Sequence, residues 1–288
     1  MGNEEDIIAK QVENFQDYDF LDFGCSQGAS LRFGVNTLRG TRGIGFDIDP
    51  QKIEEANELL KNEEEFQGEH IVICQDVLKI KYTPLTTHKF RFTTCIHFLE
   101  HLPGIREAKQ VMFNAIKLSS KFVYITEPNF DSDVNLFKQG FKTYYSDWTS
   151  HTNHMTSNIF FNILFDFYKI GYIEDFIIFY ITPIKDSSDP IIHPLNSPKN
   201  EQLFDKDAHP AKDDKVEFKN IYKDIGIIIT IKGYKKIKNV YQMIPGEKSI
   251  IYSSRKGIYE DTSENFIEEE EKKPGLLEKL NNYLNSEL

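Results

Sequence analysis

The segment Tyr18–Leu31, YDFLDFGCSQGASL, determines the fold class that we expect for this chain. Its apolar run FLDF is too short for a helix and leads directly into the small-residue turn GCSQG, which predicts a strand, a tight loop and a helix start. Gly24 and Gly28 allow the loop to turn sharply and to approach a ligand, and the following helix offers unpaired N–H groups. A structural turn without a ligand explains the same two glycines.

Four further apolar runs follow the opening strand and alternate with polar, helix-compatible stretches. The runs are 43–49, 69–77, 89–102 and 121–128, and the clearest helical stretches are 50–65 and 104–118. Strands that alternate with helices predict βαβ crossovers and a mostly parallel sheet. A sixth strand near 171–184 and a seventh near 224–236 complete the α/β fold that we expect.

Residues 184–222 separate the last two predicted strands and are rich in Pro, Asp, Lys, Asn and His. Because this separation is long for a hairpin, we predict an insertion or lid there. We place one domain at 1–236, beginning with an amphipathic helix over 4–16. Residues 237–288 form the C-terminal extension, with a strand-like run at 248–254, an acidic run and a terminal helix.

Composition restricts the classes of function. The chain has 288 residues, 40% of them hydrophobic, which is enough for a sizeable core, and its net charge of −11 disfavours a nucleic-acid surface. Cys25, Cys74 and Cys95 form no CxxC pair and are an odd number, so we expect reduced thiols in a cytoplasm. We find no signal-peptide core and no run approaching the roughly 20 apolar residues that span a bilayer, so we expect no membrane partner.

Carboxylates follow the second and third predicted strands. Asp47 comes about 20 residues after the glycine loop, where nucleoside-binding sheets use a carboxylate to bind ribose hydroxyls. Asp76 follows the third strand at the same carboxyl edge; a lone aspartate there is often a turn former, but its order after Gly24 and Asp47 favours a ligand contact. Asp49 precedes Pro50 and a helical stretch, so we interpret it as an N-cap and leave it out of the site.

The ordered set YDFLDFGCSQGAS, GIGFDID, ICQDV, TTCIHFLEHLP and SHTNHMT resembles class I S-adenosylmethionine-dependent methyltransferases, in particular the small-molecule group with a Leu-Glu-His-Leu segment. The resemblance covers about 15–183 and the strand near 224–232. It implies a Rossmann-like seven-stranded sheet flanked by helices, S-adenosyl-L-methionine as cofactor, and methyl transfer to a small acceptor such as a sugar or another hydroxylated metabolite.

The resemblance also implies that cofactor contacts come from the ends of the first three strands. These residues are Asp22, Gly24, Cys25, Ser26, Gly28, Asp47, Ile48, Asp76 and Val77. In this assignment the glycine loop frames the methionine end, Asp47 holds the ribose hydroxyls, and Asp76 meets the adenine amino group beside the Val77 backbone. The family more commonly has glycine where Ser26 stands.

Histidines supply the candidates for the acceptor side. We expect His151 to face the acceptor as a base or as an orienting group, with His97 as the competing catalytic candidate, because histidine titrates near neutrality. A histidine that only braces the loop is the alternative for His151. His154, Trp148 and Tyr145 are candidates for substrate binding, although aromatic residues before a helix are more often core.

In the resembling family, Glu100 and His101 are chiefly architectural. We expect no metal ligands.

Two other functions compete with this prediction. A nicotinamide-dependent oxidoreductase is possible because GCSQGA fits a G-x-S-x-x-A version of the dinucleotide fingerprint, but Ser26 stands where the backbone must approach a pyrophosphate. A non-catalytic, methyltransferase-like binding subunit would keep the same cofactor residues. The Asn/Asp-Pro-Pro-Tyr/Phe signature of amine- and base-methylating relatives is absent from CIHFLEHLP, which favours oxygen or carbon as the acceptor atom.

Overall fold

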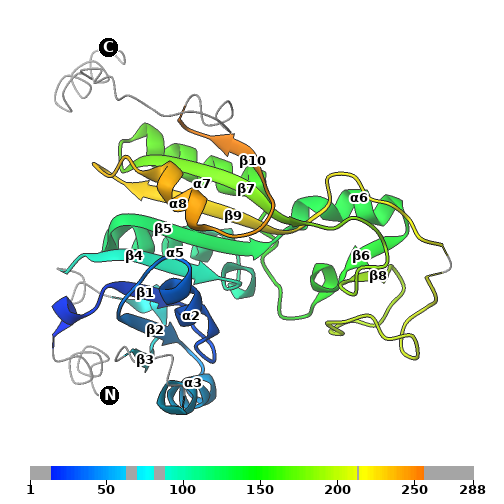
Figure 1. Ribbon diagram of the computed structural model, residues 1–288, viewed down its shortest axis with the longest axis horizontal. Helices are drawn as coiled ribbons and strands as arrows, with labels where there is room; N and C mark the ends of the chain where they lie inside the picture. Colours follow the sequence, from blue (N-terminus) through cyan, green and yellow to red (C-terminus); the bar gives the residue numbers. More distant parts are fainter. Residues whose placement is uncertain (1–13, 63–69, 81–87, 213, 256–288) are drawn as a thin grey trace. The chain divides into compact units, whose positions relative to one another are not determined.

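The computed structural model describes residues 14–62, 70–80, 88–212 and 214–255 (Figure 1). The predicted helix over 4–16 lies almost wholly outside these ranges; its described end contributes to a short 3-10 helix, η1 (Phe15–Asp17), which the Asn14 side chain caps. The acidic run and the terminal helix of the C-terminal extension also lie outside the described residues.

One sheet of eight strands organises the protein, in the order β10-β7-β9-β5-β4-β1-β2-β3 (Figure 1). The strands are β1 (Phe20–Phe23), β2 (Gly43–Asp47), β3 (Ile71–Cys74), β4 (Phe90–Ile96), β5 (Ser119–Pro128), β7 (Ile173–Pro183), β9 (Tyr222–Ile231) and β10 (Lys248–Ser253). From β3 to β5 all pairs are parallel, whereas β9 runs antiparallel to β5 and β7, and β10 antiparallel to β7. The predicted Rossmann-like, mostly parallel sheet is confirmed, with β10 as an additional edge strand.

Helices cover both faces of this sheet. They are α2 (Ala29–Asn36), α3 (Pro50–Asn62), α5 (Ile105–Leu118), α7 (Ser157–Lys169) and α8 (Ile237–Met243). Helices α5 and α7 pack on the face that carries the main apolar core, and α2 and α8 lie on the other (Figure 1). On the α2 face, Phe20, Phe92 and Phe122 stack across β1, β4 and β5 with ring centroids 4.9 Å apart. Side chains alternate along a strand, so each strand contributes to both layers.

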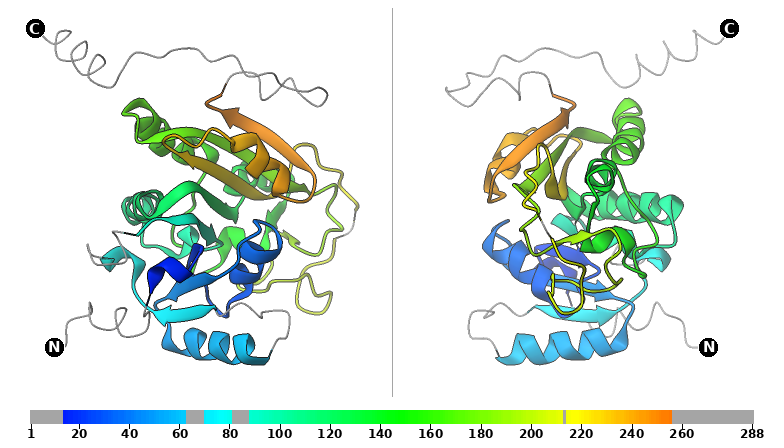
Figure 2. Two further views of the ribbon diagram at one scale, coloured as in Figure 1. Left: turned by 60° about the vertical axis from the view of Figure 1, so that its left-hand side comes forward. Right: turned by 90° about the vertical axis from the view of Figure 1, so that its right-hand side faces the viewer.

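A small lobe lies beyond the end of β5 (Figures 1 and 2). It contains α6 (Asp133–Lys138) and the antiparallel pair of β6 (Phe141–Thr143) and β8 (Ile192–Pro194). Its own core consists of Leu136, Phe141, Ile184, Ile192, Phe218 and Ile221. The insertion at 184–222 is therefore anchored on the segment that follows β5, which sequence patterns had not identified as structured. Its role as a lid stays a prediction.

All of the described residues belong to one compact unit. The domain boundary that we predict at 236 leaves α8 and β10 in the C-terminal extension, whereas β10 pairs with β7 in the main sheet and both elements belong to this unit. Within the described ranges, no helix combines the length and the apolar character that a membrane span requires.

Candidate functional site

The loop after β1 has a backbone that requires glycine. Gly24 and Gly28 have φ angles of +73° and +90°, and Ser26 between them has +45°. A Cβ atom at Gly24 would lie 2.3 Å from a ring carbon of Phe98, so the loop passes directly against that side chain. The N–H groups of Gly24 and Cys25 donate to the Phe46 carbonyl at 2.8 and 2.9 Å, which ties the loop to the end of β2.

Asp22 supports this loop from within the protein. Its side chain is fully buried and accepts hydrogen bonds from the hydroxyls of Thr94, at 2.7 Å, and Ser30. Burial raises the pKa of Asp22 to about 7, although these hydroxyl bonds oppose the shift. The Asp22 carboxyl therefore joins β1, β4 and α2 beneath the loop, and its part in framing the methionine end of the cofactor stays a prediction.

Cys25 is also a supporting residue. It is 1% exposed, and a Cβ atom at Gly45 would lie 2.8 Å from its sulfur. Burial raises the pKa of the Cys25 thiol. Its side chain thus packs on β2, and only its backbone is available to a ligand in the loop.

Asp47 connects the loop to the end of β2. One carboxylate oxygen accepts from the Ser26 N–H at 2.8 Å, and the other accepts from the Asp49 N–H at 3.0 Å. Each carboxylate oxygen can accept a second hydrogen bond, so Asp47 keeps capacity for ligand hydroxyls. The next residue, Ile48, is 67% exposed, an apolar side chain placed beside the polar site. Asp49 accepts from the Gln51 N–H at 2.9 Å, which confirms it as the N-cap of α3.

Asp76 acts as a turn former, one of the two functions that the sequence leaves open to it, and its contact with a ligand stays a prediction. Its Oδ1 accepts from the Leu78 N–H at 2.9 Å, so it caps the 3-10 helix η3 (Val77–Lys79), and its Oδ2 lies 3.4 Å from the Lys79 ammonium. The Val77 N–H stands in the first turn, where a helix leaves its amides without an intrahelical acceptor. A ligand at this edge can use that amide.

The structure brings the predicted cofactor residues to one edge. Gly24, Asp47 and Asp76 follow β1, β2 and β3, which are adjacent parallel strands, and β1 is also the neighbour of β4. The strand order reverses between β1 and β4, and ligands of open α/β sheets bind outside the carboxyl ends of the strands at such a point.

A buried glutamate holds the segment that follows β4. Glu127 of β5 accepts from the N–H groups of Phe98, Leu99 and Glu100 at 3.3, 3.0 and 3.1 Å, and so caps the 3-10 helix η4 (Leu99–His101). Burial, together with the neighbouring carboxyl of Glu100, raises the pKa of Glu127 well above its usual range. Sequence reasoning missed Glu127, because its function depends on a contact between different strands.

The histidine-rich segment after β6 docks on η4. The Asn153 backbone and side chain donate to the carbonyls of Glu100 and Leu99 at 3.1 and 3.0 Å, and the Thr152 hydroxyl donates to the Leu102 carbonyl at 2.8 Å. These bonds fix residues 150–154 beside the end of β4.

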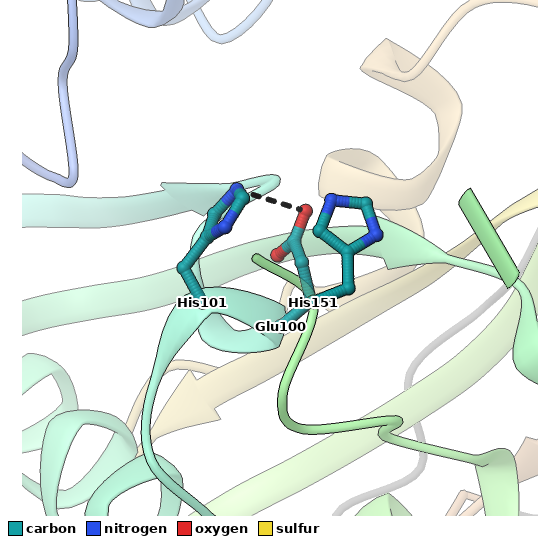
Figure 3. Close-up of side chains that lie close together, drawn as sticks. All are labelled: Glu100, His101 and His151. Carbon is teal, nitrogen blue, oxygen red and sulfur yellow. Dashed lines mark ion pairs between the residues drawn. The ribbon is translucent and has the colours of Figure 1, made fainter. Parts of the chain in front are cut away.

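This docking brings His101 and His151 to the two sides of Glu100 (Figure 3). The two imidazole rings lie 4.9 Å apart, and Nε2 of His101 lies 3.8 Å from Oε1 of Glu100. Nδ1 of His151 bonds the Tyr145 carbonyl at 3.1 Å, and burial lowers the pKa of His151 to about 4, although this bond opposes the shift. His151 is therefore neutral at pH 7. Sequence reasoning had assigned only architectural functions to Glu100 and His101.

His97 approaches the same carboxylate oxygen of Glu100 as His101 does. Its Nδ1 lies 3.6 Å from Oε1 of Glu100, and its Nε2 lies 3.5 Å from Oδ1 of Asp224 on β9. Its φ of +49° is unusual for a residue with a Cβ atom, and such strain often marks functional positions. His97 and His151, the two catalytic candidates, thus both lie close to Glu100.

The three residues that we expected to bind substrate differ in their positions. Tyr145 is 1% exposed and its hydroxyl donates to the Lys223 carbonyl at 2.7 Å, so this prediction is corrected: Tyr145 is a core residue. Trp148 is half-buried, with its ring 6.1 Å from that of His151, and His154 stacks on Phe130 at 4.1 Å. Trp148 and His154 remain candidates.

A family model described as a methyltransferase domain matches residues 21–123. This range begins within β1 and ends within β5, so it contains the glycine loop, Asp47, Asp76 and η4. The match supports the expected class I S-adenosylmethionine-dependent methyltransferase. A methyltransferase domain implies an enzyme that transfers a methyl group, with S-adenosylmethionine as its cofactor. No protein with curated annotation matches the chain.

Solved structures are similar to this chain at low identity. Magnesium protoporphyrin IX methyltransferase from Synechocystis PCC 6803, solved with bound SAH, is 13% identical, with 79% of this chain and 81% of that chain covered and a TM-score of 0.44. A SAM-dependent methyltransferase from Methanosarcina mazei is 17% identical, with coverages of 78% and 96% and a TM-score of 0.44. The YcgJ protein from Bacillus subtilis is 13% identical, with coverages of 79% and 97% and a TM-score of 0.47.

The residues at this edge fit S-adenosylmethionine. Left-handed glycines let the loop backbone approach a ligand, as at Gly24, where a side chain would collide with Phe98. Asp47 keeps unused acceptor capacity for hydroxyls. The exposed side chain of Ile48 offers an apolar surface to a ring system.

Proposed function

We propose that this methyltransferase methylates a hydroxyl oxygen of a small acceptor such as a sugar or another hydroxylated metabolite. The observation that carries the proposal is the group of histidines around Glu100 at the end of β4, with Nε2 of His101 3.8 Å from the carboxylate and Nδ1 of His97 3.6 Å from it. A hydroxyl acceptor needs groups that hold and remove its proton, and imidazoles supply both functions. The Asn/Asp-Pro-Pro-Tyr/Phe signature of amine methylation is absent at this position.

The cofactor residues would divide the binding of S-adenosylmethionine among three strand ends. The loop from Gly24 to Gly28 would hold its methionine end, Asp47 its ribose hydroxyls beside Ile48, and Asp76 its adenine amino group. When bound, the cofactor supplies an electrophilic methyl group on a sulfonium. The remaining task of the protein is to align an acceptor oxygen with that methyl group and to exclude water.

The two catalytic candidates are suited to different steps at the acceptor. A base works best when its pKa is near the operating pH, so His151, with a pKa of about 4, is a weak proton acceptor and is better suited to orient the hydroxyl. The His97 side chain is 37% exposed, with its ring nitrogens 3.6 and 3.5 Å from the carboxyls of Glu100 and Asp224, so it is accessible to an acceptor hydroxyl. We assign orientation to His151 and proton removal to His97.

The partner class and the location are also proposals. A net charge of −11 supports a small-molecule acceptor rather than a nucleic acid, because nucleic-acid binding relies on basic side chains. The three free cysteines, Cys25, Cys74 and Cys95, support a cytoplasmic location.

The test is S-adenosylhomocysteine release by the full chain with two acceptor panels, one of sugars and other hydroxylated metabolites and one of amines. We expect turnover only with hydroxylated acceptors. His151→Asn should raise KM more than it lowers kcat if His151 orients the acceptor, and His97→Gln should mainly lower kcat, by roughly 10²–10⁴-fold. Turnover restricted to amines would refute the proposal, and normal turnover by a less stable His151→Asn variant would show that this histidine only braces the loop.

A further inference from the structure

We propose that Glu100, His101 and His151 form a binding site for a divalent transition-metal ion of the Zn²⁺, Mn²⁺ or Co²⁺ type. One ligand atom from each residue lies within 4.8 Å of the corresponding atoms of the other two (Figure 3). Two imidazole nitrogens and one carboxylate are donors that such ions prefer, whereas Mg²⁺ and Ca²⁺ favour oxygen ligands alone.

Hydrogen bonds leave the correct nitrogen of each histidine free. Nδ1 of His101 lies 3.2 Å from the Ser150 carbonyl, and Nδ1 of His151 lies 3.1 Å from the Tyr145 carbonyl. A carbonyl oxygen only accepts, so Nδ1 carries the proton and the lone pair of the neutral ring is on Nε2. Metal-binding histidines almost always donate their second ring N–H to a carbonyl, carboxylate or water in this way. The pattern thus fixes both rings in the tautomer that binds a metal.

The carboxylate provides an independent observation. Glu100 is 1% exposed, and its Oε2 is buried without a hydrogen-bond partner among the described residues. A buried carboxylate oxygen without a partner is costly, and the neighbouring carboxyl of Asp224 adds negative charge near Glu100. Within the described ranges, Glu100 forms ion pairs with histidines alone. A cation on Glu100 would satisfy this oxygen and offset the charge.

The protein holds these ligands in place before an ion arrives. Glu127 fixes the backbone of η4 through three N–H groups, and Asn153 ties the segment of His151 to the carbonyls of η4. Two ligand atoms that each lie about 2.1 Å from a tetrahedral Zn²⁺ are about 3.4 Å from each other. The ligand atoms of this cluster must therefore approach one another by roughly 1 Å when the ion binds. The His101 side chain is 42% exposed and free to make this movement.

The position of the cluster connects it with methyl transfer. Phe98, which precedes η4, lies against Gly24 of the cofactor loop, so the cluster follows directly after a residue that contacts that loop. Three protein ligands leave a coordination position open, and an ion can bind an acceptor hydroxyl there and lower its pKa. This last step rests on the proposed function, whereas ion binding itself does not.

A second histidine pair supplies an internal control. His193 and His209 lie in the small lobe with ring centroids 4.5 Å apart, but they form no group with a carboxylate among the described residues that could hold an ion. Because this pair lacks a carboxylate, it tests whether two neighbouring imidazoles alone bind the ion. A further control residue is His88, whose ring packs against the ring of Phe90.

The test is titration of the chelator-treated full chain with Co²⁺ alone, followed by its visible absorption. We expect one bound equivalent with the spectrum of a nitrogen- and oxygen-ligated ion. Loss of an outer-shell partner weakens metal binding by roughly 10- to 100-fold, so Glu100→Gln and His101→Gln, which each remove a ligand, should weaken Co²⁺ binding by at least this factor. His88→Gln and His209→Gln should bind Co²⁺ as the wild type does. Circular dichroism establishes that each variant is folded.

Three results would overturn the inference: no stoichiometric Co²⁺ binding, binding unaffected in both Glu100→Gln and His101→Gln, or binding lost in His209→Gln. Calorimetry with S-adenosylhomocysteine on the same samples separates the two proposals. A chain that binds S-adenosylhomocysteine but not Co²⁺ contradicts only the metal site. A chain that binds Co²⁺ and methylates amines alone contradicts only the proposed acceptor.

Discussion

Replacing Gly24 with alanine should destabilise the protein at the cofactor loop, and the structure gives the size of the effect. The φ of +73° places an alanine in the left-handed region, at about 1–2 kcal/mol. The new Cβ would also lie 2.3, 2.4 and 2.9 Å from three carbons of Phe98. Overpacking of this kind costs about 1–3 kcal/mol, so the total loss of unfolding free energy should be about 2–5 kcal/mol.

Gly140→Ala is the matched control for this change. Gly140 has a φ of +83° but no atom within 4 Å of the added Cβ, so it should lose only the backbone cost of about 1–2 kcal/mol. Urea unfolding of both variants measures the difference, and calorimetry with S-adenosylhomocysteine should show weaker binding for Gly24→Ala alone. Truncating Phe98 to alanine in the Gly24→Ala background should recover part of the difference. A Gly24→Ala variant no less stable than Gly140→Ala would refute the argument.

Three further predictions follow from the same site. Because burial raises the pKa of Asp22 from 3.8 to about 7, its contribution to stability is complete below pH 4 and is lost as the pH rises through 7, by about 4 kcal/mol. Asp22→Asn should remove this part of the pH dependence in urea titrations, and an unchanged slope would contradict the burial argument. Asp47→Ala should weaken cofactor binding by about 1–3 kcal/mol, and Asp76→Ala by less, since water can replace a partner at the rim; calorimetry showing the reverse order would disprove the assignment. Outside the core of the small lobe, the amide hydrogens of residues 184–222 should exchange faster without ligands than with both ligands bound. Equal exchange rates in the two states would contradict the lid function.

Sequence patterns were most informative where function follows from local order. Gly24, Asp47 and Asp76 lie at the ends of β1, β2 and β3 or within two residues of them, and the carboxyl ends of parallel strands share one edge, so their meeting was predictable. The N-cap function of Asp49 depends only on its neighbours and was predicted for the same reason. Such positions need no knowledge of distant contacts.

The remaining features depend on contacts between distant segments. Tyr145 lies in the core, where its hydroxyl donates to the Lys223 carbonyl, and Glu100 is buried where Glu127 caps η4. Local periodicity does not encode either of these contacts between distant segments. The pair of β6 and β8 escaped notice because each strand has only three residues and its partner lies across the insertion. The alternation of a short strand also did not reveal that the Asp22 side chain is buried against α2.

The most direct test of the account is calorimetric titration of the full chain with S-adenosylhomocysteine and, separately, with NAD⁺. The Gly24 loop, Asp47 and Asp76 together predict one bound S-adenosylhomocysteine for each chain and no binding of NAD⁺, because Ser26 occupies the position where a pyrophosphate needs close backbone approach. Binding of NAD⁺ without any binding of S-adenosylhomocysteine would contradict the account.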